Sequence, residues 1–169
     1  MRARSSAWWQ LPVLLCASCG QGTQSSNRVE PGSQGAASGE AQHLELLPRD
    51  APPAQVLVLA GKQYAPGLVA HGKPITGTLA QGARSDHLLV LEAGRCYRVV
   101  GVGGDGVQDM DLFLYDPAGV QANQDPGQDR FPVLGKQIEI CPITAGAYRL
   151  QVQMYEGGGD FAAGVYRSE

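Results

Sequence analysis

The chain has 169 residues, which is enough for one domain of ordinary size and an N-terminal extension. Only 17% of the residues are charged, whereas 23 are glycine and 11 are proline, a composition typical of a turn-rich β protein. The formal net charge of −3 and the lack of any basic stripe in the sequence argue against nucleic acid as a partner.

Residues 1–18 have the form of an export signal. Arg2 and Arg4 give the segment a positive start, and a short apolar core follows from Ala7 to Ala17. This core is shorter than the roughly 20 residues that a membrane-spanning helix needs. We therefore expect the chain to be exported.

A cysteine follows the signal directly. The string "CASCG" resembles the lipobox of bacterial lipoproteins, because the small residues Ala17 and Ser18 stand immediately before Cys19. The resemblance implies lipidation of Cys19 and attachment to a membrane of the cell envelope, with the outer membrane as the expected location. The alternative is an ordinary secretory signal that leaves a periplasmic or secreted protein.

Residues 19–53 are expected to be a flexible tether. The stretch from Gly20 to Gly39 is rich in Gly, Ser and Gln and poor in large apolar residues. The folded domain is placed at residues 54–169, because "QVLVLAG" (55–61) could be a strand that joins it. The next segment, "KQYAPGLVAHGKP" (62–74), is predicted to be a loop.

From residue 74 onward, apolar segments alternate with Gly, Pro and Asp turns, and none has a capped helical period. This spacing predicts an all-β domain, an antiparallel β-sandwich of jelly-roll type. Within "DMDLFLYDPAG" (109–119), Phe113 and Tyr115 should lie on the face opposite the core. The residues expected to enter the core from this segment and from "YRLQVQMY" are Met110, Leu112, Leu114, Tyr148, Leu150, Val152 and Met154.

Two cysteines, Cys96 and Cys141, remain for a disulfide if Cys16 leaves with the signal and Cys19 carries lipid. One interpretation pairs their two strands antiparallel with the cysteines opposite each other. That register places Arg98 opposite Glu139, Tyr97 opposite Ile140, and Val99 opposite Ile138. The alternative is a bridge between strands of different sheets.

Residues 74–167 resemble the bacterial pre-peptidase C-terminal domain family. The similar segments are "GTLAQGARSDHLLVLEAGRCYRVV", "DMDLFLYDPAG" and "AGAYRLQVQMYEGGGDFAAGVY". They match the opening strand of that family, its aspartate-led strand and its closing hairpin. The resemblance implies a β-sandwich of a kind often attached to secreted proteases, although no peptidase domain accompanies it in this sequence.

Six aspartates fall within 25 residues of this domain, with no Lys or Arg among them. Calcium takes six to eight oxygen ligands, so Asp109, Asp111, Asp125 and Asp129 are candidate ligands. The alternative is that Asp116 and Asp125 begin turns, while Asp109 and Asp111 accept hydrogen bonds from nearby backbone. No cofactor other than calcium is suggested.

No catalytic residues are predicted. "SDH" (85–87) contains the residue types of a hydrolase triad, but adjacent strand residues point to opposite faces of a sheet. We therefore expect a non-enzymatic, lipid-anchored envelope protein that presents a β-sandwich to a protein or polysaccharide partner. The alternative is a secreted, calcium-dependent binding module without a lipid anchor.

Overall fold

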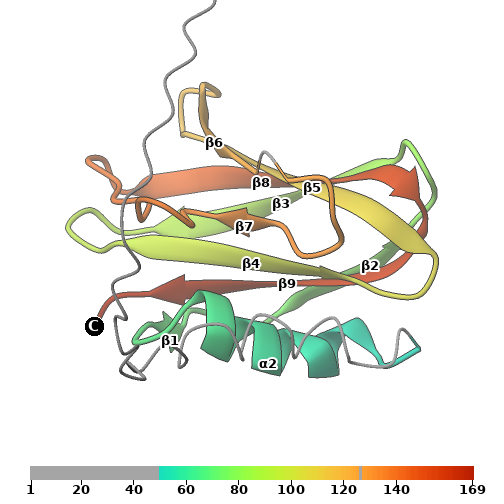
Figure 1. Cartoon of the computed structure of the whole chain (residues 1–169). Helices are drawn as coiled ribbons and strands as arrows, with labels where there is room; N and C mark the ends of the chain where they lie inside the picture. The colour runs from blue at the N-terminus through green and yellow to red at the C-terminus, as the bar shows by residue number, and fades with distance from the viewer. Residues whose placement is uncertain (1–49, 126) are drawn as a thin grey trace, which may run out of the picture. The chain divides into compact units, whose positions relative to one another are not determined.

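The computed structural model describes residues 50–125 and 127–169. The expected export signal, Cys19 and most of the expected tether lie outside these residues. Within the described part, two antiparallel sheets stack face to face, which confirms the predicted all-β sandwich (Figure 1). No helix in this part is long and apolar enough to cross a membrane.

We call one sheet the covered sheet, because helix α2 (Pro53–Tyr64) packs on its outer face, and the other the open sheet. In the covered sheet the strand order is β1-β9-β4-β7, with β2 also paired to β9, and in the open sheet the order is β3-β8-β5-β6. The strands are β1 (Val69–Ala70), β2 (Ile75–Leu79), β3 (Arg84–Leu91), β4 (Tyr97–Gly103), β5 (Val107–Tyr115), β6 (Gln121–Gln124), β7 (Val133–Leu134), β8 (Gly146–Gly157) and β9 (Gly159–Arg167).

The core between the sheets follows the predicted alternation. Leu112 on β5 lies opposite Val152 on β8, and Met110 lies opposite Met154. All seven residues that the sequence placed in the core are buried. Each fully buried side chain of this size contributes about 1.5–3 kcal/mol by leaving water. The central pair of strands in the open sheet therefore anchors the sandwich.

Residues 55–61 form a helix and not the expected strand. Helix α2 (Pro53–Tyr64) begins with a proline in its first turn, where the missing N–H costs nothing. Its buried residues Val56, Leu57, Ala60 and Gly61 share one face. A short apolar run does not by itself distinguish a strand from a buried helix, and here the packing partner decides.

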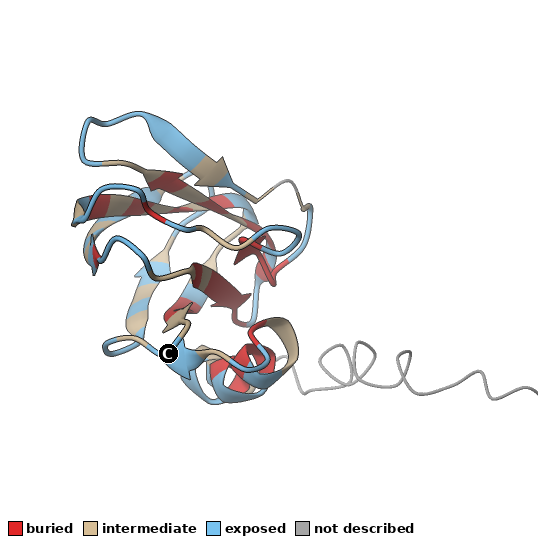
Figure 2. Ribbon diagram, turned by 90° about the vertical axis from the view of Figure 1, so that its left-hand side faces the viewer, coloured by how far each residue is buried: buried red, intermediate tan, exposed pale blue. Residues whose placement is uncertain are grey.

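Helix α2 lies across the outer face of the covered sheet (Figures 1 and 2). Its apolar face packs on Val100 and Val102 of β4 and on Ala162 of β9. The segment after it is also not all loop, because β1 pairs with the end of β9. Residues 53–70 are therefore part of the same packed domain.

The disulfide between Cys96 and Cys141 is present, with 4.1 Å between the two Cα atoms. The pairing predicted around it holds at Tyr97 and Ile140, which exchange two backbone hydrogen bonds of 2.7 and 2.9 Å. It fails one step further on, because Val99 lies opposite Leu134 of β7 and not opposite Ile138.

The reason for this failure is a bend in the chain after β7. Gly135 adopts a positive φ of 79°, a conformation that glycine tolerates and that turns the chain out of the sheet. Residues 136–145 consequently form a loop with one isolated strand pair, at Ile140, where the sequence had predicted a β segment.

Candidate binding groove

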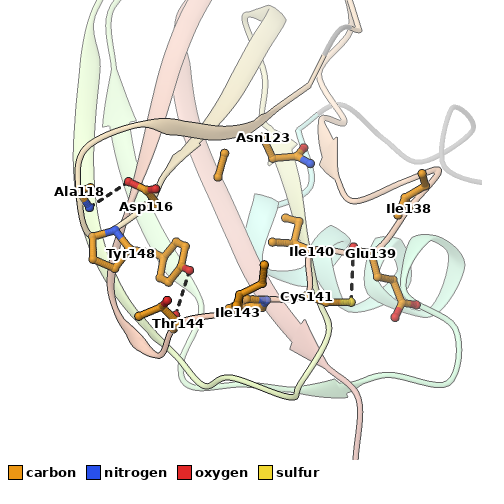
Figure 3. A pocket seen from close by; sticks show the side chains of 13 residues that line it. Asp116, Ala118, Asn123, Ile138, Glu139, Ile140, Cys141, Ile143, Thr144 and Tyr148 are labelled. Carbon is orange, nitrogen blue, oxygen red and sulfur yellow. Dashed lines mark hydrogen bonds between the residues drawn. The ribbon is translucent and has the colours of Figure 1, made fainter.

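A groove of about 660 Å³ lies at one side of the sandwich (Figure 3). One wall is the turn between β5 and β6, residues 116–118, and the other is the segment 138–144. Tyr148 from β8 and Asn123 from β6 complete the lining, and Ile140 belongs to the second wall. The groove thus lies where two loops flank the side of the β-sandwich.

Local hydrogen bonds fix the first wall. The side-chain oxygen Oδ1 of Asp116 accepts hydrogen bonds from the backbone N–H groups of Ala118 at 2.9 Å and Val120 at 2.8 Å. This is the Asx-type turn that "DPAG" predicts, so Asp116 has the structural role proposed for it. The wall is a preformed turn.

The second wall is held at three places. The disulfide attaches Cys141 to the start of β4, and Glu139 forms an ion pair of 3.5 Å with Arg98. The hydroxyl of Tyr148 donates a hydrogen bond to the backbone oxygen of Thr144 at 3.1 Å. A segment with almost no strand pairing therefore still has a defined position.

Large aliphatic side chains stand exposed along this second wall. Ile138 is 82% exposed and Ile143 is 96% exposed. Val120, beside the first wall, is also largely exposed. Sequence reasoning missed this feature because "KQIEICPITAG" was taken as one apolar β segment. The Pro142 beside the cysteine was the available signal that the segment is not a regular strand.

The four candidate metal ligands do come close together. Asp109 and Asp111 lie on β5, and Asp125 and Asp129 each pair with that strand through a backbone hydrogen bond. The backbone N–H of Asp125 donates to the oxygen of Leu112 at 3.0 Å, and the backbone oxygen of Asp129 accepts from Met110 at 3.1 Å. Backbone pairing therefore brings the acids into one cluster.

The cluster is electrostatically unfavourable. Burial, followed by repulsion from Asp109 and Asp125, raises the pKa of Asp111 to about 6. Burial is also the main cause that raises the pKa of Asp109, with repulsion from Asp129 next. Asp109 is only 7% exposed, and its Oδ1 atom has no hydrogen-bond partner within the described structure.

The other two acids accept backbone hydrogen bonds, as the turn interpretation expects of Asp125; that interpretation made no claim for Asp129, and it expected such bonds at Asp109, whose Oδ1 atom has none. Asp125 accepts from the N–H groups of Gly127 at 3.0 Å and Val133 at 3.2 Å, and Asp129 accepts from Phe131 at 2.6 Å. Across residues 50–125 and 127–169, no three acidic, histidine or cysteine side chains are grouped so that they could hold a metal ion. A calcium site at these acids stays a prediction.

The side chains of "SDH" (85–87) alternate between the two sides of β3, as expected for neighbouring residues of a strand. Ser85 Oγ and His87 Nε2 lie 2.9 Å apart on the inner side of β3, where the His87 ring meets Phe161. Asp86 lies on the other side of the strand and is paired with Arg149 at 2.9 Å. The three residues do not form a triad.

Comparison with known proteins gives a distant likeness only. No protein-family model matches the chain, and no curated protein sequence matches it. A solved structure that it resembles is PliG of Aeromonas hydrophila, a periplasmic lysozyme inhibitor of g-type lysozyme. The TM-score is 0.43 and the sequence identity 17%, over 59% of this chain and 88% of that chain. The similarity to the pre-peptidase C-terminal family stays a prediction.

Proposed function

We propose that this chain is an exported, non-enzymatic binding module that takes apolar side chains of a protein partner into the groove beside Ile143. The observation that carries the proposal is the exposure of Ile138 and Ile143, at 82% and 96%, on a wall that a disulfide holds in place. Soluble proteins rarely keep several large aliphatic side chains together in water unless a partner covers them.

The chemistry of the groove favours a protein over other partners. Its exposed apolar groups are isoleucines, which offer no flat ring for a sugar or a base to stack on. Its charged lining residues are Asp116 and Glu139, with no Lys or Arg to meet a phosphate. A partner segment that carries aliphatic side chains beside a basic residue would complement this lining.

Rigid walls support binding because ordering a flexible segment costs free energy at the moment of association. Here the walls are already ordered in the folded chain. They are held by the Asx turn at Asp116, the disulfide at Cys141 and the hydrogen bond from Tyr148 to Thr144. We therefore expect little rearrangement of the groove on binding.

Export and anchoring belong to the same proposal. A disulfide is typical of proteins that leave the reducing cytoplasm. Lipidation of Cys19 would attach the chain to an envelope membrane, with the residues between Cys19 and the start of helix α2 at Pro53 as a spacer, so that the expected tether ends one residue earlier than the sequence predicted. Labelling with a radioactive fatty acid tests the anchor, and label that persists after Cys19→Ser would place the lipid elsewhere.

Site-specific crosslinking in intact cells tests the groove. A photo-reactive amino acid at position 118 should label a partner protein, and Ile143→Asp should abolish the labelling because a carboxylate replaces the apolar contact. Val58 is a matched control, since it is exposed on α2 at the outer side of the covered sheet. Labelling that survives Ile143→Asp, or that Val58→Asp abolishes equally, would contradict the proposal.

A calcium-dependent binding module is the second candidate function. The buried, unpartnered Oδ1 of Asp109 favours it, since a cation would satisfy that atom and offset the repulsion within the cluster. The absence of a metal-holding group in the described residues makes it the weaker candidate.

A further inference from the structure

The two outer faces of the sandwich differ. Helix α2 covers the outer face of the covered sheet, whereas no described helix or strand lies over the outer face of the open sheet (Figure 2). This second face is built from β3, β8, β5 and β6, so side chains from all four strands can meet one ligand.

Cross-strand pairing arranges that face in rows. One row contains Asp86, Gln151, Phe113 and Gln124, in order across the four strands. With strands about 4.8 Å apart, a four-strand row extends about 14 Å. The neighbouring row, about 7 Å away along the strands, contains Leu88, Arg149, Tyr115 and Gln121.

The polar groups at the centre of these rows are fixed by their neighbours. Asp86 Oδ1 accepts hydrogen bonds from Arg149 and from the amide of Gln151, both at 2.9 Å. The guanidinium of Arg149 lies 3.9 Å from the centre of the Tyr115 ring. At the far end of the rows, the Gln121 amide donates to Gln124 at 2.8 Å. These side chains are held in place before any ligand arrives.

The central rows of the face are balanced in charge, and the excess of acids begins only at Asp109, at one end of β5. The two rows contain one acid and one base, Asp86 and Arg149, which neutralise each other as an ion pair. The next row along the strands again has one of each, Arg84 and Asp111, on either side of Gln153. An anionic or cationic polymer gains little from such a surface, whereas an uncharged ligand meets no electrostatic penalty.

Two half-buried aromatic rings belong to these rows. Phe113 on β5 lies between Gln151 and Gln124 of the neighbouring strands, whereas Tyr115 lies between Arg149 and Gln121 and has the Arg149 guanidinium over its ring. Phe113 is therefore the ring that stands beside amides and is free to meet a ligand. Aromatic rings pack against the C–H faces of sugars, and planar amides both donate to and accept from hydroxyl groups. A face that combines the two in fixed positions suits a polyhydroxylated ligand.

We propose that the outer face of the open sheet binds an uncharged polysaccharide, with the chain of sugars lying across the strands along the row of Phe113 and Gln151. This surface is separate from the groove proposed for a protein partner, and either could function without the other. A protein ligand fits less well, since the centre of the face is dominated by amides and an ion pair, and the large aliphatic residues Leu88 and Val90 lie at the β3 end.

Affinity electrophoresis tests the proposal with the full chain and named polymers. Gels containing hydroxyethyl cellulose, xyloglucan, galactomannan or dextran provide uncharged probes, and polygalacturonate provides a charged one. We expect at least one uncharged polymer to retard migration. Phe113→Ala and Gln151→Ala should each weaken that binding about tenfold, as loss of a ring contact or a buried hydrogen bond typically does.

Matched variants separate this face from the rest of the molecule. Gln151→Ala alters an outward side chain and should leave the thermal unfolding midpoint close to that of the wild type, so it remains informative if Phe113→Ala is unstable. Ile143→Asp in the groove and Leu59→Ser on α2 should leave retardation unchanged. No retardation by any uncharged polymer, or retardation that survives both face substitutions, would overturn the proposal. So would retardation by polygalacturonate alone.

Discussion

Replacing Asp111 by asparagine should make the domain more stable at neutral pH. The carboxylate lies on β5 between Asp109 and the chain around Asp125, so its negative charge is both partly desolvated and repelled. Asp111→Asn keeps the shape of the side chain and removes the charge. Most substitutions at partly buried positions destabilise a protein, so a gain would be a specific signature of the cluster.

The size and the sign of the effect follow from the pKa of Asp111, which rises from 3.8 to about 6 on folding. One pKa unit corresponds to about 1.4 kcal/mol, which sets a ceiling of about 3 kcal/mol on the cost at pH 7. Because Asp111 is partly exposed, screening by solvent reduces the expected gain to about 1–2 kcal/mol. The folded state holds the proton more tightly than the unfolded state. Proton binding at Asp111 therefore contributes fully to the unfolding free energy below a pH of about 3.8. This contribution is lost as the pH rises through about 6, where the folded protein must also give up the proton.

Urea denaturation at a series of pH values measures this effect. The difference in unfolding free energy between Asp111→Asn and the wild type should be about 1–2 kcal/mol at pH 7.5 and should shrink toward zero near pH 4. Asp50→Asn removes one negative charge from an exposed position outside the cluster and serves as the control. An Asp111→Asn variant no more stable than the wild type at pH 7.5, or a gain independent of pH, would refute the reasoning.

Three further predictions concern the cluster, the disulfide and the helix. Millimolar calcium should leave the thermal midpoint unchanged, because no three described acids are grouped to hold a metal ion; a rise that disappears in Asp111→Asn would instead establish a cation site. The double substitution of Cys96 and Cys141 by serine should lower the unfolding free energy by about 4 kcal/mol, the chain-entropy value for a separation of 45 residues, as measured in urea. Gly61→Ala should lower it by about 1–3 kcal/mol, because the new methyl group would collide with the Tyr166 ring, whereas Lys62→Ala at the adjacent exposed position should not.

The sandwich itself was predictable because strand alternation is a local property. Met110, Leu112 and Leu114 could be assigned to the core from their spacing alone, and their strand partners on β8 followed the same rule. The helix was not predictable in this way. Residues 55–60 are mostly apolar, with no clean period of two or of 3.6, and only packing against β4 and β9 selects the helix.

The groove was harder to predict than the core for a related reason. Its second wall depends on the bend at Gly135 and on a single bridge between Tyr97 and Ile140, neither of which has a repeating pattern. The sequence did indicate the disulfide, and the register built on it placed Arg98 opposite Glu139, which form an ion pair at that wall. It did not indicate that Ile138 and Ile143 would face solvent beyond it.

The location of the disulfide connects stability with binding. The core residues between the sheets are buried without help from the bridge, since β5 and β8 pair along most of their length. The bridge acts instead on residues 136–145, which have one isolated strand pair and carry the two exposed isoleucines. Without the bridge, this wall should become mobile while the sandwich remains folded. Segments with few contacts open locally at a lower free energy than the buried core does. Reduction of the disulfide should therefore abolish binding in the groove at denaturant concentrations where the core is still intact.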